Sequence, residues 1–255
     1  MTPTGKRSAY ALAFAALCAG AILAAIAIPS ADASRAKVIG HTKHTPRPAC
    51  PNLKDTAKCQ VVGRVTGFMT VADGRKRPFR APRDGRIVAW AVDLGKATDN
   101  HGANELTYFG TLFQSKDFGK QPTGRLAVIK HKNGVSYKLL RQSPVVGLRG
   151  ALGSKQIYTL DKPLLVRKGD IVAFTSPTFT PNFAYQGLSS KNNKWRGSRK
   201  KDNCVPRGGN SPTDRQKRRF ARHSHAHQKV GSIHSYECLY TGGRILYWAY
   251  FVPNK

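Results

Sequence analysis

The feature that most constrains the fold is a two-residue hydrophobic period, which recurs in short segments bounded by turn residues. Within residues 86–94 the large apolar side chains alternate and share one face: Val88, Trp90, Val92 and Leu94. This period is typical of a strand with one buried face. Asp84-Gly85 supplies a turn before it. After residue 33, no segment of useful length shows the 3.6-residue period of an amphipathic helix, so the sequence predicts an all-β chain.

Residues 125–142 predict a β-hairpin. Its turn is Asn133-Gly134, the pair that best tolerates the positive φ angles of a type I′ turn. Residues 156–160, 164–166 and 171–175 predict further strands, and Lys168-Gly169-Asp170 turns the chain between the last two.

The C-terminal segment 244–252 is apolar or aromatic on both faces, which is typical of a strand inside a packed sheet or at an interface. Short strands joined by regular turns favour a sandwich or a barrel. We therefore predict an antiparallel β-sandwich, jelly-roll-like, over residues 60–255.

Residues 1–33 predict a signal peptide. Lys6 and Arg7 form a positive start, residues 9–28 are uncharged and mostly apolar, and Ala31-Asp32-Ala33 has the small-x-small pattern of a cleavage site. Cleavage would leave a secreted or extracellular protein beginning at Ser34. The alternative is a membrane-anchored protein, since twenty apolar residues can just span a bilayer.

Export and removal of residues 1–33 would leave four cysteines: Cys50, Cys59, Cys204 and Cys238. An even number of cysteines in an exported chain predicts two disulfides. Three pairings are open, and we favour Cys50 with Cys59 and Cys204 with Cys238. No Cys-x-x-Cys spacing supports a zinc site.

Two segments depart from the strand pattern. Residues 34–59 are basic and contain prolines without an apolar period, which predicts a flexible leader. Residues from about 186 to 235 are rich in Gly, Asn, Ser and charge, which predicts one long basic loop insertion.

The opening of the strand region resembles a known pattern. Pro82, Asp84-Gly85 and the strand with Trp90 are similar to the start of a group of secreted bacterial β-sandwich domains of unknown function. Segments 125–129, 137–140 and 165–172 resemble the later strands of that group. The resemblance covers residues 78–175. It implies a jelly-roll-like fold and no particular activity.

Positive charge is the strongest functional signal. Lys and Arg number 43 against 13 Asp and Glu, a formal charge of +30. Such an excess attracts anionic polymers and anionic membrane surfaces, and charge alone favours no specific nucleic acid. The predicted binding residues lie in the basic insertion: Arg199, Lys200, Lys201, Lys217, Arg218, Arg219 and Arg222. The alternative is a solvated surface whose charge, spread over the whole chain, has no specific role.

Two weaker signals lie near the same insertion. Phe183, Tyr185 and Trp195 could stack on sugar rings, although aromatic residues more often complete a core. His223, His225 and His227 alternate along the chain, and an extended backbone would point them one way. Three imidazoles suit zinc, copper or nickel, but the basic residues around them oppose a cation.

No local motif supports catalysis. The chain has no Gly-x-Ser-x-Gly elbow, no His-Glu-x-x-His and no phosphate-loop lysine motif. The sequence therefore predicts a non-enzymatic protein without a cofactor that associates with anionic components of the cell envelope. A carbohydrate-binding module that uses the aromatic residues is the alternative, and a hydrolase whose site is not visible in the sequence is a third. The oligomeric state stays open.

Overall fold

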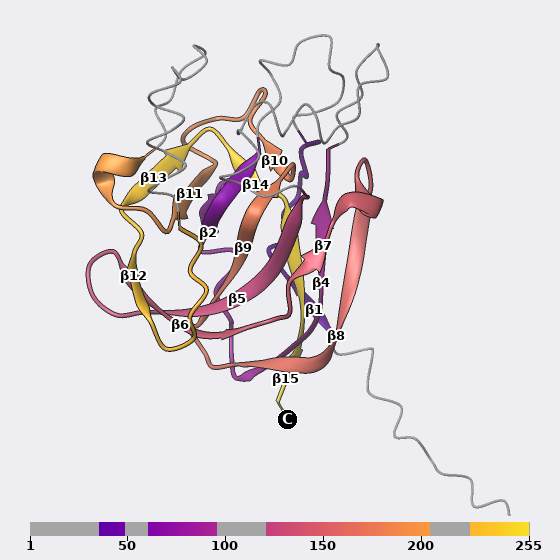
Figure 1. The fold of residues 1–255 in the computed structure, drawn as a ribbon, viewed down its shortest axis with the longest axis vertical. Coiled ribbons are helices and arrows are strands. Elements are labelled where there is room, and N and C mark those ends of the chain that lie inside the picture. The colour runs from indigo at the N-terminus through magenta and orange to yellow at the C-terminus, as the bar shows by residue number, and fades with distance from the viewer. Residues whose placement is uncertain (1–35, 49–60, 96–120, 205–224, 255) are drawn as a thin grey trace, which may run out of the picture. The chain divides into compact units, whose positions relative to one another are not determined.

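Two antiparallel sheets pack face to face in the computed structural model, which describes residues 36–48, 61–95, 121–204 and 225–254 (Figure 1). The all-β antiparallel sandwich is therefore confirmed. No α-helix occurs in these four ranges, which hold only the two short 3-10 helices η3 (Arg149–Ala151) and η4 (Lys201–Asn203). Nor does any helix in the described ranges have the length and apolar character needed to cross a membrane.

The smaller sheet has four strands, in the order β1 (Lys37–Ile39), β15 (Tyr247–Pro253), β4 (Gly85–Asp93) and β8 (Lys155–Val166). The larger sheet follows the order β12 (Ile233–Ser235), β6 (Ser136–Gln142), β5 (Thr123–His131), β9 (Ile171–Thr180), β2 (Val62–Ala72), β11 (Lys194–Gly197) and β13 (Cys238–Thr241). Two short strands extend it, β3 (Arg75–Lys76) beside β2 and β7 (Val146–Gly147) beside β5. A separate pair joins β10 (Phe183–Ala184) to β14 (Arg244–Ile245).

The main core lies between the two sheets. Trp90 of β4 is 1% exposed and stacks on Tyr158 of β8, with ring centroids 4.7 Å apart. Tyr247 of β15 donates its hydroxyl to the Val172 carbonyl of β9 at 3.0 Å, which ties the two sheets together. A buried hydroxyl needs such a partner because an unsatisfied polar group in a core is costly.

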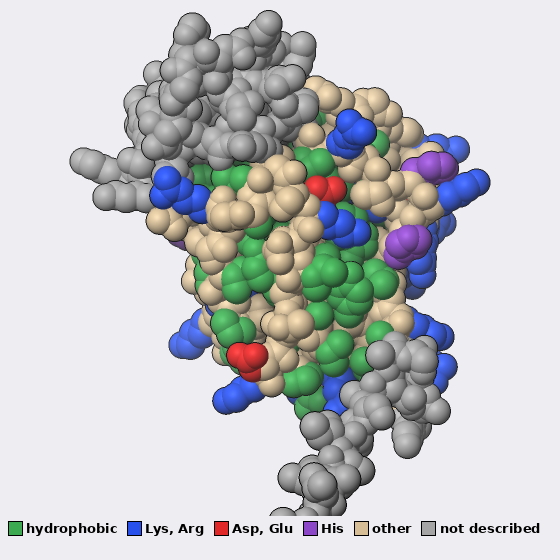
Figure 2. All heavy atoms as spheres, turned by 90° about the vertical axis from the view of Figure 1, so that its right-hand side faces the viewer, with side chains coloured by type: hydrophobic (Ala, Val, Ile, Leu, Met, Phe, Trp, Pro, Cys, Tyr) green, Lys and Arg blue, Asp and Glu red, His purple; other side chains and the backbone are tan. Residues whose placement is uncertain are grey.

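A second core covers the outer face of the larger sheet. The residues before β12 contact this face, where the His227 backbone N–H donates to the Thr66 hydroxyl at 2.9 Å. Tyr236, just after β12, is fully buried among apolar side chains of several strands, which include Phe68, Ala127, Ile129, Tyr137, Leu139, Ile171 and Ala173. The outer face of the smaller sheet is also apolar: Ile157 and Leu165 are exposed there, and the Lys155 ammonium lies 4.3 Å from the centroid of the Trp248 ring. Figure 2 shows apolar side chains gathered on that side with Lys and Arg around them.

The predicted strands are present, with two local differences. In β4 the pairing with β15 shifts between Ile87 and Ala89, so Val88 is an extra residue, and Ile87 joins Trp90 in the core instead of Val88. The hairpin of β5 and β6 is confirmed. Its loop spans residues 132–135, and Gly134 has a positive φ of 49° but Asn133 does not, so the predicted type I′ turn is wrong.

The strand β15 lies between β1 and β4, which confirms that the two-sided apolar C-terminal segment occupies the middle of a sheet. Residues 34–59, in contrast, are not simply a flexible leader. Residues 37–39 form the edge strand β1 on β15. The buried Arg244 then holds the next residues in place, with hydrogen bonds to the Thr42 hydroxyl at 2.6 Å and the His44 carbonyl at 2.8 Å.

The segment 186–235 is also not one loop. Strand β11 lies inside the larger sheet between β2 and β13, and β12 pairs with β6. The two-residue period is not visible in β11, because Trp195 is its only large apolar residue and the flanking residues are glycine or basic. The rest of the predicted insertion, residues 205–224, lies outside the described residues.

Candidate functional site

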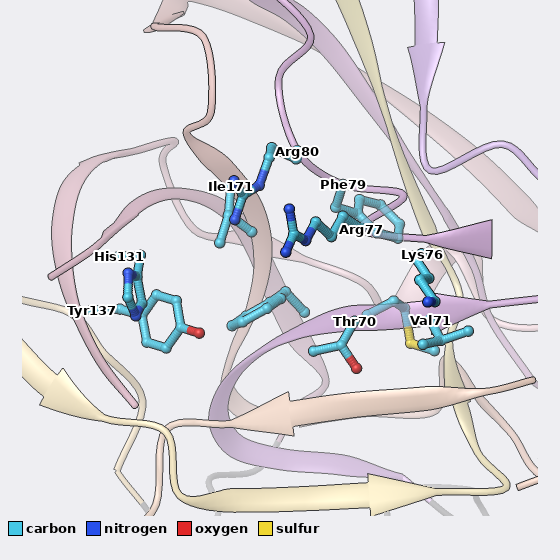
Figure 3. A pocket seen from close by; sticks show the side chains of 11 residues that line it. Thr70, Val71, Lys76, Arg77, Phe79, Arg80, His131, Tyr137 and Ile171 are labelled. Atoms are coloured by element: carbon cyan, nitrogen blue, oxygen red, sulfur yellow. The ribbon is translucent and has the colours of Figure 1, made fainter. Parts of the chain in front are cut away.

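A cleft of about 480 Å³ opens on the outer face of the larger sheet (Figure 3). Its floor comes from four neighbouring strands, and each contributes one side chain from the same face: Tyr137 of β6, His131 of β5, Ile171 of β9 and Phe68 of β2. His131 and Tyr137 are directly opposite in the β5–β6 register, which explains their edge-to-face ring contact at 5.3 Å. The floor is thus set by the pairing of the sheet.

The rim of the cleft comes from the basic segment, which we define as residues 75–80. Its residues are Arg75, Lys76, Arg77, Pro78, Phe79 and Arg80. A two-residue turn, Asp73-Gly74, starts it, and both residues have a positive φ, 51° and 77°. The turn pairs β3 with the end of β2. Further along, Arg80 forms a β-bridge with Ile171, so the segment passes beside the start of β9.

Three cations of the basic segment line the cleft: Lys76, Arg77 and Arg80. All three side chains are exposed. Figure 3 shows the head groups of Arg77 and Arg80 turned toward the side on which His131 and Tyr137 lie. No acidic side chain of the described residues lines the cleft, and no hydrogen bond or ion pair from the three cationic head groups to another described residue is present. The rim therefore presents uncompensated positive charge over an aromatic floor.

The hydroxyl of Tyr137 adds a neutral donor. Burial raises the pKa of Tyr137, and the nearby Arg196 and Arg80 oppose this only in part. The group is therefore protonated at neutral pH. His131 uses its Nε2 to donate to the Gly134 carbonyl at 3.0 Å, which fixes the ring at the cleft wall. Cations, a phenol and an imidazole together suit an anionic, hydroxyl-bearing ligand.

Two features of the sequence point to this site. Asp73-Gly74, which follows the apolar pair Val71-Ala72, is a hairpin-turn signal. Four basic residues among the six that follow it form the kind of short Lys/Arg-rich run associated with polyanion binding. The convergence of β5, β6 and β9 on that run could not be found from local sequence, because it depends on long-range strand pairing.

The predicted anion-binding residues lie in several environments. Arg199 is 4% exposed and donates to the Tyr240 hydroxyl at 3.0 Å and to the Gly63 carbonyl at 2.7 Å, so its assignment to a binding surface is wrong. Lys200 and Lys201 are exposed, but the Glu237 carboxylate accepts the Lys201 backbone N–H at 2.8 Å. The other four predicted residues lie outside the described residues: Lys217, Arg218, Arg219 and Arg222.

The three aromatic residues assigned to sugar stacking do not form an exposed platform. Phe183 and Trp195 are 9% and 6% exposed and meet edge to face in the core at 5.9 Å. Trp195 also stacks on Tyr240 at 4.2 Å. Tyr185 is half-buried against the same core. These three aromatic residues therefore contribute to the core.

The alternating histidines do not converge. His225 is exposed, whereas His227 is fully buried and stacks on His234 at 4.1 Å. Both ring nitrogens of His227 have partners, the Tyr236 hydroxyl and the Ser232 carbonyl, each at 3.0 Å. No group of three or more His, Cys, Asp or Glu placed to hold a metal occurs in the described part of the chain. His223 lies outside it.

The disulfide between Cys204 and Cys238 is present, as predicted. Cys238 lies in β13 and is 1% exposed. Cys50 and Cys59 lie outside the described residues, so their pairing stays a prediction.

Comparisons with known proteins found no relative: no family model matches the chain, and neither the curated proteins nor the solved structures gave a match. We therefore infer the function from the geometry and charge of the cleft.

Proposed function

We propose that this protein is a secreted, non-enzymatic β-sandwich that associates with anionic polymers or surfaces of the cell envelope through the cationic cleft. The observation that carries the proposal is the set of three exposed cations, Lys76, Arg77 and Arg80, without a carboxylate among the described residues that line the cleft. Exposed cations that lack a counter-charge favour an anionic partner, and binding releases the counterions of that partner.

Export is part of the proposal. It is supported by the signal-like residues 1–33 and by the Cys204–Cys238 disulfide, because such bonds persist in oxidising compartments. Binding to a neutral glycan through the predicted aromatic residues has less support, since two of the three are buried.

The proposal predicts a steep dependence of binding on salt. Short duplex DNA of mixed sequence serves as a uniform polyanion, and the affinity should fall from 50 to 300 mM NaCl. If the three cations each neutralise one phosphate, a slope of log affinity against log salt of about −3 or steeper follows, since each contact contributes about −0.9. Anionic phosphatidylglycerol vesicles should bind in the same way.

Two controls separate this proposal from its alternatives. Vesicles of phosphatidylcholine alone and a neutral glucan should not bind. Salt-independent binding to the glucan would contradict the proposal and favour a carbohydrate-binding module.

A further inference from the structure

We infer that the cleft takes one sugar unit that carries a phosphate monoester, with the phosphate between Arg77 and Arg80 and the sugar hydroxyls toward Tyr137 and Thr70. This inference rests on the proposed function, because it names the chemical group of the polymer that the cationic cleft recognises. The monoester could be a terminal phosphate of the polymer or a free sugar phosphate, and both present the same doubly charged group to the cleft.

The volume of the cleft suits a ligand of the size of one sugar phosphate. Its volume of about 480 Å³ lies within the range of roughly 300–1,000 Å³ found for small-molecule sites. Its floor is apolar: Phe68, Met69, Phe79 and Ile171 are each less than one-tenth exposed. The polar groups stand at the rim. A ligand with a charged end and a less polar body matches this division.

The cations favour phosphate over carboxylate. A phosphate monoester carries about −1.5 to −2 charges at pH 7 and three terminal oxygens. Two guanidinium groups, from Arg77 and Arg80, can contact the three oxygens, and Lys76 adds a third positive charge to the cleft lining. A carboxylate has two oxygens and one charge, so a single Arg satisfies it and two cations would stay uncompensated.

The backbone at Arg77 adds an independent observation. Arg77 has a φ of +53°, a left-handed conformation that is unfavourable for a residue other than glycine. Its backbone N–H donates to the Thr70 carbonyl at 2.8 Å, which holds the chain in this conformation just after β3. The following Pro78 removes the next backbone donor. The strained residue is one of the three cleft cations, and such strain is concentrated at ligand sites.

Two other groups in the cleft can bind sugar hydroxyls. The Tyr137 hydroxyl has no hydrogen-bond partner among the described residues, and Figure 3 shows it turned toward the interior of the site. The Thr70 hydroxyl donates to the Lys194 carbonyl at 3.1 Å, which leaves its oxygen free to accept. A donor from β6 and an acceptor from β2, at separate places in the cleft, fit a ring that carries both hydroxyls and a phosphate.

The test compares four small probes by NMR chemical-shift titration: glucose 6-phosphate, glucuronate, glucose and inorganic phosphate. We expect glucose 6-phosphate to bind about tenfold more tightly than glucuronate, because phosphate engages both guanidinium groups. Glucose 6-phosphate should bind about threefold more tightly than inorganic phosphate, because its sugar ring makes additional contacts. Glucose alone should not bind.

Conservative variants show which side chains contact the phosphate and which contact the sugar. Arg77→Lys and Arg80→Lys keep the positive charge but lose the planar guanidinium group. Each should lower the affinity for glucose 6-phosphate about fivefold. Tyr137→Phe should lower the affinity for glucose 6-phosphate about threefold and leave the affinity for inorganic phosphate unchanged. Arg86→Lys on the smaller sheet, a matched exposed arginine, should change neither probe.

The outcomes separate this inference from the proposed function. Equal affinity for glucose 6-phosphate and glucuronate would overturn the inference. So would the absence of binding by either phosphate probe while the polymer still binds in a salt-dependent way. If neither the probes nor the polymer bind, the proposed function fails as well. Competition by glucose 6-phosphate against a polymer that bears terminal phosphate monoesters, but not against a polymer of carboxylated sugars, would support it.

Discussion

Loss of the Cys204–Cys238 disulfide will lower the free energy of unfolding by about 3 to 4 kcal/mol. The bond joins residues 34 positions apart, so its removal frees the unfolded chain from a long closed loop. It also connects the chain that follows β11 to β13, and Gly197 of β11 pairs directly with Cys238. For a domain of this size, the change corresponds to a Tm lower by about 10 °C.

The measurement is thermal and chemical unfolding of the double variant Cys204→Ser, Cys238→Ser beside the wild type. Dithiothreitol provides the matched control, since it should bring the wild type to the stability of the variant. Any further loss that it causes in the variant would reveal the predicted Cys50–Cys59 pair. A double variant as stable as the wild type would show that the bond constrains nothing in the unfolded chain.

Acidification from pH 7 to pH 4 will destabilise the fold through His227. Burial is the main cause that lowers the pKa of His227 to about 4, and the neighbouring His234 adds to it against the opposing effect of the Ser232 carbonyl. The unfolded residue titrates near 6.5. Between these values the unfolded chain takes up a proton that the folded chain does not, so stability is present above pH 6.5 and is lost as the pH falls toward 4. The loss is about 2 to 3 kcal/mol.

Burial also lowers the pKa of His234, with a contribution from His225, so the stacked pair acts in the same direction. His227→Gln keeps a donor for the Ser232 carbonyl and removes the titration. Its free energy of unfolding, measured by urea at several pH values, should depend less on pH than that of the wild type. His41→Gln, at an exposed histidine, is the control and should keep the wild-type slope. An unchanged slope in His227→Gln would place the acid sensitivity elsewhere.

The strands could be predicted where burial is one-sided. In β6 one face meets the core and the other is less buried, so the period of two is visible in the sequence. In β4 both faces are buried at residues 89–92, and the period shows as Trp90 and Val92 on the core face alternating with alanines. The bulge at Val88 could not be predicted, because it depends on how β15 pairs with β4. Strand β11 was missed for a related reason: a short central strand needs few apolar residues when its neighbours β2 and β13 supply the burial.

The functional prediction from charge was coarse because the sequence does not say which cations are exposed. Arg199 and Arg244 satisfy backbone carbonyls and hydroxyls inside the fold, whereas Arg77 and Arg80 reach a cleft. The buried pair and the cleft pair look alike in a count of charges. The difference comes from long-range neighbours: the Gly63 carbonyl lies 136 positions from Arg199. The larger number of basic residues in 199–222 predicts binding there and not in the shorter basic segment 75–80.

The most direct test of the cationic cleft is the salt dependence of polyanion binding in two matched triple variants. One is Lys76→Gln, Arg77→Gln, Arg80→Gln in the cleft. The other removes the same charge from exposed positions elsewhere: Arg86→Gln, Arg149→Gln and Lys162→Gln. With duplex DNA as the probe, the slope of log affinity against log salt should become shallower by about 2 to 3 in the cleft variant and by less than about 1 in the other. Equal losses in both would contradict the account, since affinity would then come from charge spread over the whole surface and not from the cleft.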